Sequence, residues 1–176
     1  MQTSIYFGIV SSLFIGACFT EPEGEPEGQP VAVARNAPER SVSGGGRVDY
    51  DFAGLPEGYR ETYGFSARQR PDGSVDGNIE FHWDAPYDLK AHGDITCLNV
   101  QGNGAWIGFA ITRSDQPEEF PVGAEIVFYV ADNGSGHAAP ADQVSFFFGA
   151  PAQVCQYQDG PPRILFDWTH GNVTVR

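Results

Sequence analysis

The segment Ala91–Ser114, AHGDITCLNVQGNGAWIGFAITRS, is the clearest indication of the fold class. Its two runs, His92–Val100 and Ala105–Ile111, are rich in Ile, Val, Thr, Phe and Trp. Apolar and polar residues alternate in both runs, as in strands that bury one face. The residues between the runs, Gln101-Gly102-Asn103-Gly104, contain Asn-Gly, a strong signal for a tight turn. This stretch therefore predicts a β-hairpin.

Comparable segments lie on both sides of the hairpin, and none of them has a period of 3.6 residues. Eight sequential strands with short links predict an all-β fold, an antiparallel up-and-down meander. We expect the meander to close into a small barrel, because closure leaves no unpaired edge. A two-sheet β-sandwich is the alternative. Besides the hairpin, the predicted strands are 48–52, 63–68, 79–84, 125–131, 144–148, and 164–168 continued by 173–175 after a turn or bulge at 170–172.

Length and charge limit the function classes. The 176 residues suffice for one ordinary domain, predicted at 47–176, and 22 Gly and 13 Pro favour short strands joined by turns. A net charge of -13 repels phosphate and anionic lipid headgroups. We therefore expect no nucleic-acid partner, whereas cationic partners are compatible with this charge. The oligomeric state does not follow from the sequence.

The N-terminus has the features of an export signal. Ile5–Ala17 is an apolar run of signal-peptide length, which predicts a signal peptide over residues 1–17. Ile15-Gly16-Ala17-Cys18 resembles the end of a bacterial lipoprotein signal. The resemblance implies a lipid on Cys18, the only membrane attachment we expect, and a periplasmic or cell-surface protein. The alternative is an ordinary signal peptide cleaved near Ala17, which would give a secreted soluble protein.

Residues 18–46 have the composition of a linker. Glu21-Pro22-Glu23-Gly24 is repeated at residues 25–28, and Ser43-Gly44-Gly45-Gly46 ends the segment. Such a segment buries too little apolar surface to offset the entropy of ordering it. We predict a disordered acidic spacer.

The three cysteines fit the export prediction. With lipid on Cys18, Cys97 and Cys155 remain, and disulfides persist in an oxidising compartment. We expect them to form a disulfide. Closing a loop of roughly 58 residues stabilises a fold by about 4 kcal/mol in the chain-entropy model.

One patch of side chains has the composition of a chemical site. If the strands at 79–84 and 92–100 form a hairpin centred near Tyr87, His82 faces His92 and Glu80 faces Asp94. Two imidazoles and two carboxylates on one face suit acid–base chemistry or a divalent cation. The alternative is a solvated polar face with a slightly different register.

No other pattern indicates a cofactor or a metal. Asp132 and Asp142 flank a polar loop, but the order of ligands in a calcium-binding EF-hand is missing. We predict no cofactor and no metal site. Asp132 and Asp142 would be the weak candidates for metal ligands.

The string His92-Gly93-Asp94-Ile95-Thr96-Cys97-Leu98 resembles a group of uncharacterised exported bacterial proteins. This resemblance covers about the last 110 residues and implies export but no particular activity.

The leading interpretation is a non-enzymatic, lipid-anchored barrel that binds a small apolar ligand or another envelope component. We expect ligand entry at a barrel mouth, with Trp83, Trp106 and Tyr129 as candidate lining residues. The second interpretation is a small isomerase or hydrolase that uses Glu80, His82, His92 and Asp94. The third is a structural or adhesion domain with a filled barrel.

Overall fold

The computed structural model describes residues 38–50, 58–84, 86–136 and 138–176. The predicted signal peptide, Cys18 and the first part of the predicted linker lie outside the described residues. The described part has these elements: β1 Arg40–Asp49, β2 Arg60–Gln69, β3 Val75–Trp83, β4 Leu89–Gln101, β5 Gly104–Ser114, β6 Glu125–Ala131, β7 Gln143–Val144, β8 Phe148–Gly149, the 3-10 helix η1 Ala152–Tyr157, and β9 Phe166–Val175.

None of the helical structure in these ranges is long and apolar enough to cross a membrane.

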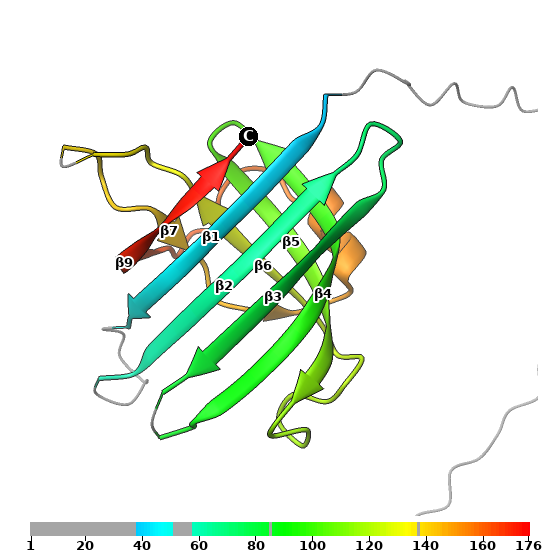
Figure 1. Ribbon diagram of the computed structural model, residues 1–176, viewed down its shortest axis with the longest axis vertical. Coiled ribbons are helices and arrows are strands. Elements are labelled where there is room, and N and C mark those ends of the chain that lie inside the picture. Colours follow the sequence, from blue (N-terminus) through cyan, green and yellow to red (C-terminus); the bar gives the residue numbers. More distant parts are fainter. Residues whose placement is uncertain (1–37, 51–57, 85, 137) are drawn as a thin grey trace, which may run out of the picture. The chain divides into compact units, whose positions relative to one another are not determined.

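Eight of the strands form a closed antiparallel barrel (Figure 1). β1 to β6 pair in sequence order, β6 pairs with β7, and β7 pairs with β9. The ladder between β9 and β1 completes the ring, and in Figure 1 the red β9 lies beside the blue β1. β8 pairs only with β6 and is additional to the ring. The predicted all-β barrel is confirmed, and the two-sheet sandwich is excluded.

The predicted hairpin is formed by β4 and β5. Gln101 pairs with Gly104, so Gly102 and Asn103 are the two loop residues. Gly102 has a φ of 62° at the first loop position, where type II′ turns need glycine. β6 has the bounds of the predicted strand.

The predicted linker boundary at residue 46 is wrong, because β1 begins at Arg40. Gly44 and Gly46 face the interior in phase with the buried residues Val42 and Val48. Neighbouring rings occupy the space that side chains there would need. A Cβ at Gly44 would lie 2.7 Å from Cζ of Phe65. The glycines therefore admit large rings from β2 and β9 instead of making the segment disordered.

The predicted strand at 144–148 is interrupted. β7 and β8 both pair with β6, and the residues between them leave the ladder. The Ser145 hydroxyl accepts a hydrogen bond from the backbone N–H of Tyr129 at 2.9 Å. Phe146 and Phe147 both pack against the barrel core, whereas Phe148 is 42% exposed. In a regular strand Phe146 and Phe147 would point to opposite faces. The irregular backbone instead places both rings against the core.

Aromatic side chains fill the centre of the barrel. Phe147 lies with its ring centroid 4.9 Å from Phe81, 5.5 Å from Phe109 and 5.3 Å from Phe128. Phe81, Phe109 and Phe128 are almost completely buried. Ligand-sized space must therefore be sought at a barrel end or outside the barrel.

Candidate functional site

A covering segment, residues 150–162, lies on the outer face of the barrel and contains η1. A disulfide joins Cys155 of η1 to Cys97 of β4, with the Cα atoms 6.2 Å apart, as predicted. A bulge between Ile95 and Cys97 reverses the inside–outside alternation of β4. The buried Ile95 and Leu98 consequently face the main core, and Cys97 faces the covering segment.

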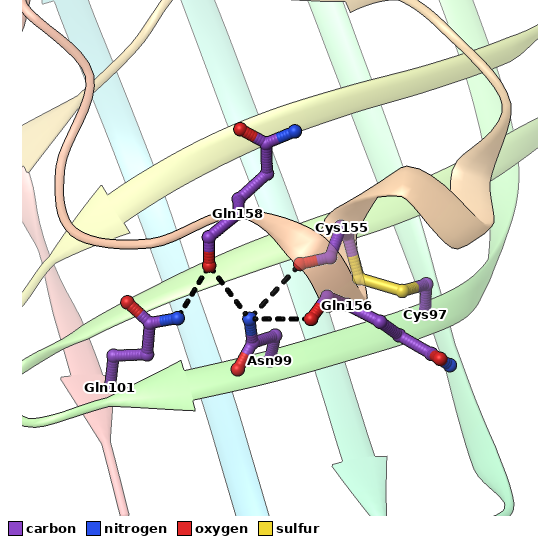
Figure 2. Close-up of a disulfide and its surroundings, with 6 residues drawn as sticks. All are labelled: Cys97, Asn99, Gln101, Cys155, Gln156 and Gln158. Atoms are coloured by element: carbon purple, nitrogen blue, oxygen red, sulfur yellow. Dashed lines mark hydrogen bonds between the residues drawn. A yellow bond between two sulfur atoms is a disulfide. The ribbon is translucent and has the colours of Figure 1, made fainter.

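Amide side chains of β4 hold the covering segment next to the disulfide (Figure 2). Asn99 donates from Nδ2 to the carbonyl oxygens of Cys155 and Gln158, each at 3.1 Å. Gln101 donates from Nε2 to the Gln158 carbonyl at 2.5 Å and accepts at Oε1 from the Gly160 N–H at 2.8 Å. Cys97, Asn99 and Gln101 are two residues apart in sequence, so one face of β4 supplies all these contacts.

A second, smaller core lies beneath the covering segment. Trp106, Val127, Tyr129 and Ala131 are buried there together with the disulfide. The Trp106 indole N–H donates to the Gly160 carbonyl oxygen at 2.8 Å. η1 touches the backbone of β5 directly, because a Cβ at Gly108 would lie 2.9 Å from Cα of Ala152.

A groove of about 370 Å³ lies between the covering segment and the barrel wall; we call it the outer groove. The Trp106 and Phe148 ring centroids are 6.3 Å apart on its barrel side. Asp159 is the one ionisable residue among its described lining residues. The lining consists of Trp106, Val127, Phe148, Ala150, Val154, Gln158, Asp159, Pro161 and Pro162.

A second space of about 280 Å³ lies at the barrel end where β3 stops and β6 starts; we call it the mouth pocket. The rings of Trp83 and Phe120 meet edge to face there, with centroids 4.8 Å apart at 89°. The indole N–H of Trp83 is buried and has no hydrogen-bond partner among the described residues. The lining consists of Trp83, Glu119, Phe120, Ala124, Glu125, Ile126, Phe147 and Gly149.

The same barrel end contains a buried carboxyl group that the sequence reasoning missed. Glu61 is 5% exposed and pairs across the sheet with Trp83. The Tyr59 hydroxyl donates to Oε1 of Glu61 at 2.5 Å, and the Tyr50 hydroxyl donates to Oε2 at 2.7 Å. The Tyr63 hydroxyl lies 2.7 Å from that of Tyr50. Four oxygen-bearing side chains thus form one buried network.

Burial dominates the acidity of this network. It raises the pKa of Glu61 to about 7, although the two tyrosine hydrogen bonds favour the charged form. Burial and the neighbouring carboxylate both raise the pKa of Tyr50 and of Tyr59. Glu61 is therefore the group of the network that exchanges a proton near neutral pH.

The polar patch predicted around His82 and His92 lies on the outer face, but its register is wrong by two residues. Glu80 pairs with His92, and His82 pairs with Lys90. Five residues link Trp83 to Leu89, so the hairpin is centred on Pro86, one residue before the predicted centre near Tyr87. A shift of two keeps the same face while exchanging every partner.

The members of this patch are consequently divided into separate contacts. His92 Nδ1 lies 3.8 Å from the exposed Glu80 carboxylate and contacts the Arg113 guanidinium. His82 lies 3.2 Å from Asp88 and 3.6 Å from Asp84. Asp94 is exposed and pairs with Asn78 across the ladder. A depression of about 440 Å³ brings His92, Glu80 and Asp94 to one surface without His82.

The three predicted lining residues occupy two different places. Trp83 lines the mouth pocket, as expected for a barrel mouth. Trp106 and Tyr129 belong to the small core beneath the covering segment, and only Trp106 lines the outer groove. Side chains of β5 and β6 alternate between the main core and the small outer core, and Trp106 and Tyr129 both face the outer core.

Asp132 and Asp142 bind backbone N–H groups. Asp142 accepts from Asn133 at 2.8 Å and from Val173 at 2.6 Å, and it is 6% exposed. Asp132 accepts from Gly134 at 2.9 Å and from Val175 at 3.1 Å. Both carboxylates thus tie the loop after β6 to β9. Within the described ranges, no three His, Cys, Asp or Glu side chains are grouped to hold a metal ion.

A period of two residues could have revealed the buried carboxyl group. Tyr59, Glu61, Tyr63, Phe65 and Ala67 alternate with exposed residues and share one buried face. A glutamate in phase with core residues is a candidate for burial.

Comparison of the chain with protein-family models, with curated proteins and with solved structures finds no match.

Proposed function

We propose that this protein is an exported binding protein that holds a small apolar ligand in the outer groove. The observation that carries the proposal is the groove itself, about 370 Å³ between aromatic residues of the barrel and prolines of the covering segment. Small-molecule sites typically have volumes of roughly 300–1,000 Å³, mainly apolar walls and a few polar groups. Asp159 and Gln158 are the polar groups that would orient a ligand there.

The groove is formed before a ligand arrives. The disulfide and the bonds from Asn99, Gln101 and Trp106 hold the covering segment on the barrel. A site that is already ordered loses little conformational entropy on binding. The ordered groove therefore suits ligand binding, because it does not have to rearrange first.

A pair of variants in η1 tests the groove. Val154 lines it, whereas Gln156, two residues further, is exposed and lies outside it. We expect the neutral dye N-phenyl-1-naphthylamine to gain fluorescence with the wild-type protein and Val154→Trp to weaken its affinity at least tenfold. Gln156→Trp, the matched control, should bind like wild type. Absence of dye binding to the wild type, or equal affinity of Val154→Trp, would refute the proposal.

The cellular location belongs to the same proposal. The lipoprotein-like end of the signal at Cys18 supports a lipid anchor, and a disulfide fits an oxidising compartment. In a bacterial host, the full chain should accompany the membrane fraction, and Cys18→Ser should leave it. A variant that stays in the membrane fraction would exclude the lipid on Cys18. Release of the unsubstituted chain as a soluble protein would favour the ordinary signal peptide.

The other interpretations have weaker support. The small isomerase or hydrolase would use the outer polar patch, but its carboxylates are exposed and its two histidines contact different carboxylates. Water screens charges at such a surface and reduces their effect on a reaction. The structural or adhesion domain needs no ligand, so it would be favoured by a wild-type protein that binds no dye.

A further inference from the structure

The mouth pocket has a composition different from that of the outer groove. Three aromatic side chains line it, and Trp83 and Phe120 meet at nearly right angles. Its two ionisable lining residues are Glu119 and Glu125, and no Lys or Arg is among its described lining residues. The buried Glu61 is the cross-strand partner of Trp83, so a third carboxyl group lies on the neighbouring strand.

Aromatic rings together with carboxylates favour a positively charged ligand. The face of an aromatic ring attracts a cation, most strongly for tryptophan, and carboxylates attract the same charge. An anionic ligand would meet two carboxylates without a compensating base. The net charge of -13 also favours approach of a cation.

The size of the pocket narrows the choice of ligand further. A space of about 280 Å³ suits one ring with a short chain. We propose that the mouth pocket is a binding site for small organic amines, separate from the outer groove. The apolar part of the amine lies against Trp83, Phe120 and Phe147, and its ammonium group lies near Glu119 and Glu125.

Three probes of the same shape test the charge selectivity. These are 2-phenylethylamine, 2-phenylethanol and phenylacetate, titrated into the full-length protein at pH 7.5 and followed by calorimetry and by the indole N–H signals in NMR. The chain has three tryptophans, so the Trp83 signal is identified by its loss in Trp83→Phe. We expect the amine to bind at least tenfold more tightly than phenylacetate and to shift the Trp83 signal.

Carboxylate variants locate the charge. The double variant Glu119→Gln/Glu125→Gln should weaken the amine at least fivefold and leave 2-phenylethanol unchanged. Glu118→Gln is the matched control, because Glu118 is exposed and does not line the pocket. Equal affinity for the amine and phenylacetate, amine binding without a shift of Trp83, or no amine binding would each overturn the proposal. None of these results depends on Val154, so failure here is distinct from failure of the outer groove.

Discussion

Replacing Glu61 with Gln should change how the stability of the barrel depends on pH. The carboxyl group is 5% exposed and accepts hydrogen bonds from Tyr50 and Tyr59. Glutamine has nearly the same shape but cannot ionise. Its Oε1 can still accept from Tyr59, and its Nε2 can donate to Tyr50, whose hydroxyl then donates to Tyr63.

The sign follows from the direction in which folding moves the pKa. Burial raises the pKa of Glu61 from 4.5 to about 7, so between these values the folded protein retains a proton that the unfolded chain loses. The free energy of unfolding therefore falls as the pH rises through this window. The difference of about 2.5 pH units, at about 1.4 kcal/mol for each, corresponds to about 3 kcal/mol. Well below pH 4.5 this loss of stability is absent, because Glu61 is protonated in both the folded and the unfolded state.

Urea unfolding of the disulfide-bonded protein at several pH values from 4 to 8 measures this effect. Relative to Glu61→Gln, the wild-type protein should lose about 3 kcal/mol between the two ends of the range. Glu80→Gln, an exposed residue on the outer face of β3, shows what a carboxyl-to-amide change does without burial. A difference between wild type and Glu61→Gln that stays constant with pH would refute the assigned role of burial.

Two further predictions concern the architecture. Replacing Cys97 and Cys155 together with Ala should lower the free energy of unfolding by about 4 kcal/mol in guanidinium titrations, since the disulfide closes a loop with a sequence separation of 58; a loss below about 1 kcal/mol would contradict this account. Gly44→Val should cost about 1–3 kcal/mol because the new side chain meets the Phe65 ring in the core, and Gly45→Val should cost less, since its Cβ meets nothing closer than 3.6 Å. Equal thermal midpoints for the two glycine variants would contradict the assignment of Gly44 to the inner face of β1 and of Gly45 to its outer face.

Part of the fold could be predicted from local patterns. The alternation in β4, β5 and β6 is local, and Gly102 supplies the turn conformation that the hairpin requires. The disulfide followed from counting cysteines in a chain whose N-terminus has the features of an export signal. These predictions needed only strand periodicity and the chemistry of the predicted compartment.

The candidate sites depended more on irregularities in the alternation. The bulge before Cys97 turns that side chain towards the covering segment, and the interruption after Val144 brings both Phe146 and Phe147 inside. A single extra residue reverses every position that follows it, and composition does not reveal where it occurs. The partners in the polar patch were exchanged for a related reason, since the centre of the connection after β3 was misplaced by one residue.

Local patterns in the chain were sufficient to predict the strand-forming segments, the hairpin and the pairing of the two cysteines, because these depend on neighbouring residues or on residue counts. The remaining features depend on long-range packing. Gly44 and Gly46 fit within a strand because rings from β2 and β9 fill the space that larger side chains would need there. Glu61 is buried at neutral pH because the closed ring surrounds it with tyrosines, and the outer groove exists because a distant segment lies over β5 and β6. Each of these features needs contacts between residues far apart in sequence, which local periodicity cannot specify.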